Sequence, residues 1–193
     1  MPKIVEVLLP EEIGVAQNTY TNPDFTQILV ACNEGYAVID IEAHKILAHI
    51  VFHNLERIAD CYYTNEQGFI LAILTSETLV IQSADTAKKI QIFYPENPFK
   101  TCSWSPDGTR LVCVDDKNRL TIFQVSSNGI DETATQQYRA TDKSSIDLEM
   151  GIDINIQGWS NDGQAAVVKF GHILASGIHV INIETGAIVL QIS

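Results

Sequence analysis

Basic residues are scarce in this chain of 193 residues: 12 Lys and Arg stand against 24 Asp and Glu, a formal net charge of −12. This acidic excess opposes binding to phosphate backbones and to anionic lipid surfaces, so neither nucleic acid nor a membrane is expected as a partner. Long hydrophobic runs are also missing, because stretches such as Phe69 to Leu74 have strand length and fall short of the ~18 residues that a membrane helix needs. The first residues lack the apolar segment of a secretory signal, and we therefore expect a cytoplasmic protein.

Paired cysteine motifs are absent as well. The four cysteines show no CxxC spacing and lie inside apolar runs, where free thiols behave as small buried hydrophobic groups. No Asn-x-Ser/Thr glycosylation site occurs. The sequence therefore predicts reduced thiols in the core, at Cys32, Cys61, Cys102 and Cys113.

The motifs of common catalytic and cofactor sites are missing too: there is no phosphate-binding loop, dinucleotide fingerprint or EF-hand. His49 and His53 would lie ~13 Å apart along an extended strand, too far to share one zinc ion. Residues 158–163 (Gly-Trp-Ser-Asn-Asp-Gly) exceed a nucleophile elbow by one residue and favour a hairpin. We predict no catalytic, cofactor or metal site and expect no enzymatic activity from this chain.

Short β-type runs separated by turn residues make up most of the chain, almost without a 3.6-residue apolar period, and this pattern predicts an all-β fold. The runs recur as a strand–turn–strand unit, clearest over residues 102–125. Each third strand ends in an apolar residue followed by a polar one, at 39–40, 81–82, 123–124 and 181–182, with steps of 42, 42 and 58 residues. A constant module with a single acidic insertion at 126–153 explains the unequal step.

These repeats resemble the WD-repeat family of β-propellers. The resemblance covers nearly the whole chain and is most specific at 104–108 (Trp-Ser-Pro-Asp-Gly) and 159–163 (Trp-Ser-Asn-Asp-Gly), with the strand endings at 38–45 and 180–186 in support. The repeats are degenerate, because the namesake Trp-Asp pair is missing and no copy opens with the family's Gly-His pair. The resemblance implies one β-propeller-like domain, 1–193, of about four four-stranded antiparallel blades. Approximate blades are 14–53, 58–95, 99–140 and 153–193, preceded by an extra strand at 3–9.

Four blades are fewer than the six to eight usual for such repeats, and an open arc would expose the apolar faces of its terminal blades. Three arrangements fit this count: part of a larger propeller, a half-propeller completed by another copy or another chain, or a closed four-bladed ring. The second arrangement implies a homo-oligomer formed through the terminal blades.

Binding is expected at the loops that join the second and third strands of each blade, because propellers hold such loops at one rim. These loops are mostly acidic, which suggests protein partners with a basic surface, although wet turns are polar for simpler reasons. The candidate partner-binding residues are Asn33, Glu34, Glu77, Asp115, Asp116, Lys117 and His172.

Two functional hypotheses follow from the sequence. The first is a non-catalytic protein–protein interaction module or scaffold, in which rigid sheets position variable loops. The alternative is an accessory propeller domain, or a fragment, of a larger multidomain enzyme or complex subunit. The missing nucleophile, base and metal set favours the first, while the extra N-terminal strand keeps the second open.

Overall fold

A computed structural model describes residues 6–53, 55–126, 129–136, 153–172, 175–185 and 188–192. The chain divides into two compact units, Met1–Tyr94 and Pro95–Ser193. Apart from one short 3-10 helix, η1 (Glu11–Ile13), every regular element of the described residues is a β-strand. The prediction of an all-β fold is therefore confirmed.

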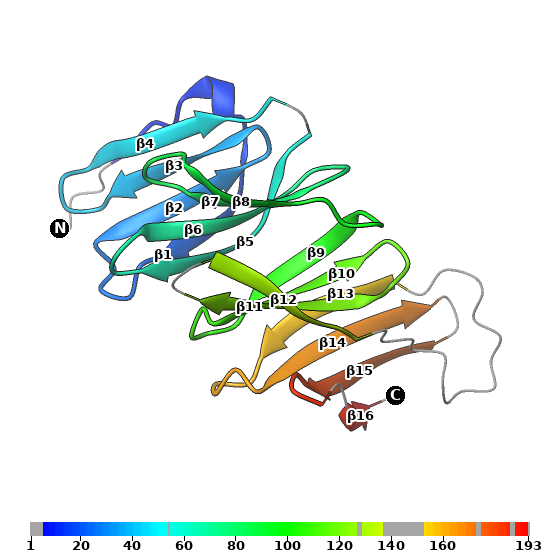
Figure 1. The fold of residues 1–193 in the computed structure, drawn as a ribbon. Coiled ribbons are helices and arrows are strands. Elements are labelled where there is room, and N and C mark those ends of the chain that lie inside the picture. The colour runs from blue at the N-terminus through cyan, green and yellow to red at the C-terminus, as the bar shows by residue number, and fades with distance from the viewer. Residues whose placement is uncertain are drawn as a thin grey trace. The chain divides into compact units, whose positions relative to one another are not determined.

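The N-terminal unit contains two four-stranded antiparallel sheets whose strands follow one another in chain order (Figure 1). The first sheet consists of β1 (Ala16–Thr21), β2 (Gln27–Cys32), β3 (Gly35–Asp40) and β4 (Lys45–Val51). The second sheet consists of β5 (Arg57–Thr64), β6 (Gly68–Leu74), β7 (Leu79–Ser83) and β8 (Lys89–Phe93).

The C-terminal unit repeats this organisation with two further four-stranded antiparallel sheets. The third sheet consists of β9 (Phe99–Trp104), β10 (Arg110–Asp115), β11 (Leu120–Ser126) and β12 (Gly129–Gln136). The fourth sheet consists of β13 (Asp153–Trp159), β14 (Ala165–His172), β15 (Ala175–Asn182) and β16 (Ile188–Ile192). The repeat predicted from the sequence, a four-stranded antiparallel sheet, therefore occurs four times among the described residues.

The hairpin between the first and second strands is the most regular part of each repeat. In every sheet one residue of this hairpin adopts a left-handed backbone conformation: Phe25 (φ 58°), Gly68 (φ 68°), Gly108 (φ 66°) and Gly163 (φ 67°). Glycine adopts this conformation without a steric penalty, which explains its use in three of the four hairpins. Phe25 is the exception among them.

A β-bulge distorts the outer strand pair of every sheet. One residue of the fourth strand has no direct partner on the third strand, namely Leu47, Ile90, Thr133 and Val189 in the four sheets. An extra residue bends the strand and increases its twist. The bulge therefore belongs to the repeat, like the hairpin.

The core of the N-terminal unit lies between its two sheets. Leu29 and Val38 of the first sheet pack with Phe69, Leu71 and other buried side chains of the second sheet. A polar contact links the same sheets, because the hydroxyl of Tyr36 donates to the carbonyl of Ala84 at 3.1 Å. Burial raises the pKa of Tyr36 to about 12, so the hydroxyl keeps its proton for this bond near neutral pH.

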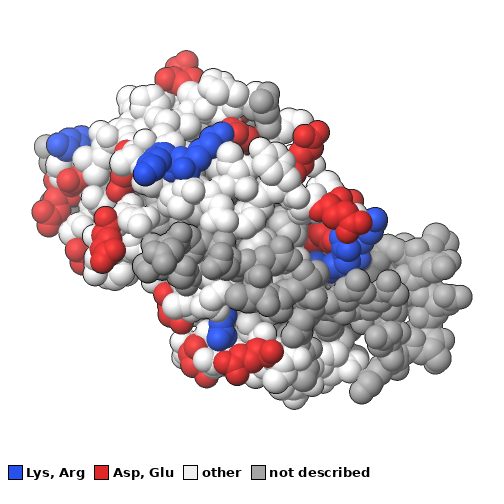
Figure 2. Space-filling model, in the orientation of Figure 1, with Lys and Arg blue, Asp and Glu red and all other residues white. Residues whose placement is uncertain are grey.

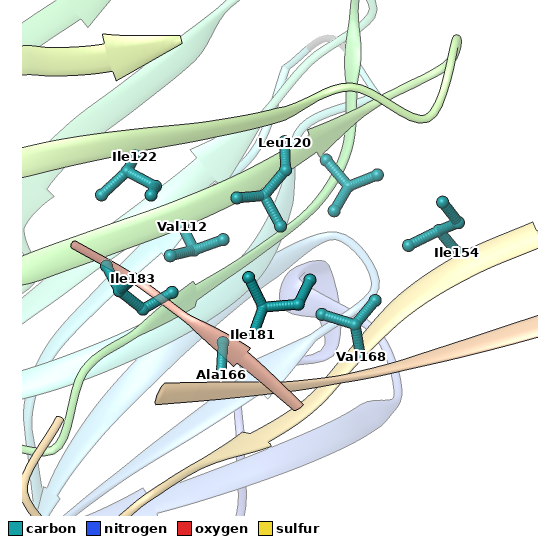
Figure 3. Close-up of a cluster of buried hydrophobic side chains, with 9 residues drawn as sticks. Val112, Leu120, Ile122, Ile154, Ala166, Val168, Ile181 and Ile183 are labelled. Atoms are coloured by element: carbon teal, nitrogen blue, oxygen red, sulfur yellow. The ribbon is translucent and has the colours of Figure 1, made fainter. Parts of the chain in front are cut away.

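The core of the C-terminal unit lies between the third and fourth sheets, as Figure 3 shows. Its members are Val112, Val114, Leu120, Ile122, Ile154, Ala166, Val168, Ile181 and Ile183. Trp159, packed against this cluster, donates its indole N–H to the hydroxyl of Ser103 at 3.1 Å and so joins the two sheets. Trp104, at the end of β9, is buried.

The second face of the first sheet is covered by the segment that precedes β1. Ile13 of η1 is fully buried in a cluster with Val30, Cys32 and other side chains of this sheet, and Val7 and Leu9 pack against the same cluster. Residues 6–10 form no strand, while residues 3–5 of the expected strand at 3–9 lie outside the described residues. The described part of this segment thus contributes apolar side chains instead of strand pairing.

Two connecting segments contain strand. The acidic insertion at 126–153 begins with β12, the fourth strand of the third sheet, while residues 137–152 lie outside the described residues. The connection between the second and third strands of the fourth sheet is short, because Gly171 pairs with Ser176 and His172 with Ala175. The extent of the propeller domain as a single unit of 193 residues stays a prediction.

All four cysteines are free; Cys32, Cys102 and Cys113 are buried and Cys61 is half-buried, which confirms the prediction of unpaired core thiols for three of them. Among the described residues, none of the helices has the length and apolar character required to cross a membrane.

Candidate binding rim

The turns that join the second and third strands, here called the rim turns, carry the residues predicted to bind partners. In the first sheet this turn holds Asn33 and Glu34, both exposed. The backbone N–H of Val15 donates to the side-chain oxygen of Asn33 at 2.6 Å, and the N–H of Glu34 donates to the carbonyl of Ile13 at 3.1 Å. The segment after η1 therefore fixes this turn, while the Glu34 carboxylate faces solvent.

Gly35 holds the same turn against the neighbouring strand. A side chain at Gly35 would collide with the backbone carbonyl of Ile50 and with Ile13, so only glycine allows this close approach. The backbone N–H of Phe52 donates to the carbonyl of Glu34 at 2.8 Å, which brings the end of β4 beside the turn. The first rim turn is thus held from two sides.

The rim turn of the second sheet is closed by threonine side chains. The Thr75 hydroxyl accepts the backbone N–H groups of Glu77 and Thr78 at 3.1 and 2.9 Å, and it lies 2.9 Å from the Thr78 hydroxyl. These bonds satisfy the turn internally, as Ser and Thr commonly do. The exposed side chain of Glu77 is left to contact solvent or a partner.

The rim turn of the third sheet is organised by Asp115, which is buried. Its carboxylate accepts the backbone N–H of Lys117 at 3.0 Å and both the backbone N–H and the Nε–H of Arg119 at 2.7 Å. This hydrogen bonding, with a smaller contribution from Glu96 at 3.2 Å, raises the pKa of Arg119 above its ordinary value. Asp115 therefore shapes the turn, and its neighbours Asp116 and Lys117 are the exposed members.

His172 ends β14 in the fourth sheet, and its side chain lies outside the described residues. The six other predicted rim residues all belong to the rim turns of the first three sheets. On the face shown in Figure 2, acidic side chains form several small separate groups instead of one continuous patch. The charge available to a partner is therefore local to individual turns.

Sequence reasoning missed Leu55, which lies in the connection between β4 and β5. Its side chain is 93% exposed and its backbone is left-handed, with φ 46°. The connection starts at Phe52, whose N–H bonds to Glu34, so it lies at the same end of the strands as the first rim turn. The short polar context, His-Asn-Leu-Glu at 53–56, gives no periodic signal that would have identified this leucine.

The described residues contain no group of three or more His, Cys, Asp or Glu side chains that could hold a metal ion. The two hairpin serines have structural partners: the hydroxyl of Ser105 donates to Asp107 at 2.6 Å, and that of Ser160 donates to Asp162 at 2.6 Å. Each serine oxygen also accepts a backbone N–H of the following strand at 2.9 Å. These hydrogen bonds close the hairpins that hold the two serines.

No protein-family model matches the chain. No curated protein matches it either.

Solved structures do match it, at low sequence identity. The β-propeller domain of Swd1 from Myceliophteria thermophila is 9% identical, with a TM-score of 0.70 over 97% of this chain and 57% of that one. A chain of hydrazine synthase from Kuenenia stuttgartiensis is 12% identical, with a TM-score of 0.60 over 95% of this chain and 52% of that one. A chain of a mitotic checkpoint complex is 14% identical, with a TM-score of 0.58 over 84% of this chain and 47% of that one.

This chain thus spans about half the length of the solved chains it matches. Identities this low show the fold alone. The sheets and the match to the Swd1 domain agree on that fold: this chain is an all-β, β-propeller-like protein with four four-stranded antiparallel sheets.

Proposed function

We propose that this chain is a degenerate WD-repeat-like propeller that acts as a non-catalytic protein-interaction module. The observation that carries the proposal is a contrast within the rim turns between a fixed backbone and exposed charged side chains. Their backbones are fixed by internal hydrogen bonds, while Glu34, Glu77, Asp116 and Lys117 remain exposed. Preorganised turns with free charged side chains suit the binding of a partner, because little conformational entropy is lost on association.

The proposed contact residues lie in each unit separately, with Glu34, Glu77 and Leu55 in the N-terminal unit and Asp116 and Lys117 in the C-terminal unit. Apolar anchors contribute most of the free energy in protein interfaces, whereas rim charges mainly set association rates and selectivity. Leu55 would supply an anchor beside Glu34 in the N-terminal unit. In this proposal Asn33 and Asp115 hold their turns, His172 marks the same position in the fourth sheet, and the partner carries a basic surface.

The accessory-domain alternative draws on the hydrazine synthase chain among the structural matches. At 12% identity this match carries no catalytic assignment to the present chain. The described residues offer no metal cluster of their own, and both hairpin serines are bonded within their turns. We therefore place interaction ahead of an accessory role in an enzyme.

The test is a triple variant, Glu34→Gln with Glu77→Gln and Asp116→Asn, immobilised beside the wild-type chain and exposed to the same lysate. We expect defined proteins to bind the wild type, to be lost at raised salt, and to be reduced at least tenfold on the variant. A control of equal charge change, Glu6→Gln with Glu11→Gln and Glu66→Gln at other exposed positions, should retain them. Equal retention on the rim variant and the wild type would refute a rim-based function.

Self-association through a terminal sheet is part of the same proposal. Ile178, Leu190 and Ile192 lie on one face of the fourth sheet and are exposed. Light scattering across a dilution series should show a dimer that becomes monomeric in the Leu190→Lys, Ile192→Lys double variant. A wild-type chain that is monomeric at all concentrations would exclude this interface.

A further inference from the structure

A corner of the fourth sheet is filled by an arginine of its neighbour. The guanidinium of Arg110, from the third sheet, donates through Nη1 to the carbonyl oxygen of Gly163 at 3.2 Å. Its Nη2 lies 3.6 Å from the carboxylate of Glu184. Ile183, the residue before Glu184 in the chain, is buried in the core cluster, with 4% of its surface exposed. A carbonyl and a carboxylate thus define an arginine-binding corner, next in sequence to a buried isoleucine.

The first sheet contains the same corner. Phe25 occupies the left-handed hairpin position of Gly163. The N–H of Ile41 donates to Thr26 at 2.9 Å, as the N–H of Ile183 donates to Gln164 at 2.9 Å.

The turn that follows β3 in the first sheet matches the turn after β15 as well. The N–H of Ala43 bonds to Asp40, as the N–H of Thr185 bonds to Asn182. This correspondence places Glu42 at the position of Glu184.

In the first sheet the corner is open. Among the described residues no Lys or Arg side chain forms an ion pair with Glu42, and no backbone N–H donates to the carbonyl oxygen of Phe25. Ile41 is 38% exposed, in contrast to its buried equivalent Ile183, and Phe25 is 68% exposed. Glu42 is exposed as well, so one carboxylate and two apolar residues of the corner are accessible to solvent.

Phe25 is costly at this position. A side chain in the left-handed conformation clashes with the following carbonyl, and the other three hairpins avoid the clash with glycine. The ring gains little from the fold in return, because most of it is exposed. Strained backbone positions cluster at functional sites such as ligand clamps, which directs attention to Phe25 as a contact residue.

We propose that this corner binds an arginine side chain of a protein partner, presented on an extended segment. The guanidinium would donate to the Phe25 carbonyl and the Glu42 carboxylate while it stacks on the Phe25 ring, and an apolar neighbour would contact Ile41. Arginine suits these groups better than lysine because its planar fork donates to two acceptors at once and stacks on aromatic rings. The proposal rests on the interaction function above but uses the opposite end of the strands from the rim turns.

Phe25 also limits the shape of the partner that can enter this corner. In the fourth sheet a Cβ atom at Gly163 would lie 3.6 Å from Ser105 and from Asp107, so the hairpin of the neighbouring sheet packs directly on the glycine. A phenylalanine ring at this position would occupy the space of that hairpin. The corner of the first sheet therefore favours a narrow peptide segment over a second sheet packed in the same way.

The first arm of the test measures stability. Glycine and asparagine both tolerate the left-handed conformation, so Phe25→Gly and Phe25→Asn should raise the Tm by a few degrees, or at least leave it unchanged. A lower Tm in both variants would mean that the ring serves the fold, and it would overturn the proposal.

The second arm measures binding with a phage-displayed dodecapeptide library selected on the full chain. We expect selected peptides that combine Arg with a large apolar residue. Their synthetic forms should lose affinity at least tenfold on Phe25→Asn, on Glu42→Gln, and when their Arg is replaced by Lys. Peptides that bind these variants as tightly as the wild type, or a selection that returns no Arg-containing binder, would overturn it.

The rim variant distinguishes this proposal from the function on which it rests. Glu34→Gln with Glu77→Gln and Asp116→Asn should leave affinity for the selected peptides unchanged. Peptides that lose affinity on the rim variant, but not on Phe25→Asn or Glu42→Gln, would support the rim and refute the arginine corner.

Discussion

The first and fourth sheets differ in whether the face turned away from the core of their unit is covered. In the first sheet, the face turned away from the core of its unit is covered by Ile13, Val7 and Leu9. In the fourth sheet, the corresponding outer face presents Leu190 and Ile192, which are 51% and 54% exposed. The same kind of module is thus closed on one face by a short segment and left open on another.

This difference shows that a short segment is enough to cover the second apolar face of a sheet. A single turn of 3-10 helix and a few preceding residues place three apolar side chains over Val30, Ala37 and their neighbours. A full neighbouring sheet, as in the C-terminal unit, supplies more side chains for the same purpose. Repeat modules require a cover for each apolar face, but the cover need not be another repeat.

The largest expected effect is at Ile13, which is fully buried. Ile13→Ala should lower the free energy of unfolding by about 3 kcal/mol, because it removes buried methyl groups and leaves a cavity beneath the covering segment. Ile192→Ala, the same substitution on the exposed face, should cost less than about 0.5 kcal/mol at protein concentrations where the chain is monomeric. Urea titrations of both variants measure the contrast, and equal losses would show that the two faces are covered to the same extent.

Exchanging the hairpin residues of the two sheets should give a smaller effect. Gly163→Phe imposes a left-handed phenylalanine where Ser105 and Asp107 pack against the glycine, and we expect a loss of about 2 kcal/mol. Thermal unfolding monitored by circular dichroism checks the value. A neutral result would mean that the hairpin of the fourth sheet can move away from its neighbour.

The smallest effect concerns pH. His179 of β15 is buried, and this burial lowers its pKa in the folded state. The unfolded chain, with an ordinary His pKa of ~6.5, therefore takes up the proton first as pH falls, and stability declines below that value.

We expect the wild type to lose more stability between pH 7.5 and 5.5 than His179→Gln, by less than ~1.4 kcal/mol, the value of one pKa unit. Urea titrations at the two pH values provide the comparison. Parallel losses in both proteins would assign the pH dependence to other groups.

Turn chemistry made the four sheets predictable. Pro, Asp and Gly at 106–108 and Asn, Asp and Gly at 161–163 specify hairpins locally, and alternating apolar runs between them specify strands. The exposure of the rim positions Glu34, Glu77 and Asp116 could be predicted from turn-forming residues of the same kind. Local signals of this kind survive in a single sequence because each acts within a few residues.

Other features depend on contacts between distant residues. Nothing near Asp115 indicates that its carboxylate is buried against Arg119, and the polar context of Leu55 hides its exposure and backbone strain. The equivalence of Phe25 with Gly108 and Gly163 appears only when hydrogen bonds align the hairpins. The apolar spacing at Val7 and Leu9 is compatible with a strand or with a covering segment, because spacing alone does not say whether a segment pairs or packs.

The bulge repeated in every outer strand bears on how the protein behaves in concentrated solution. Flat edge strands recruit one another into intermolecular sheets, and natural proteins prevent this by bending or twisting their edges. Leu47, Ile90 and Val189 interrupt the edge register of β4, β8 and β16. This irregularity therefore makes the strand edges poor templates for aggregation.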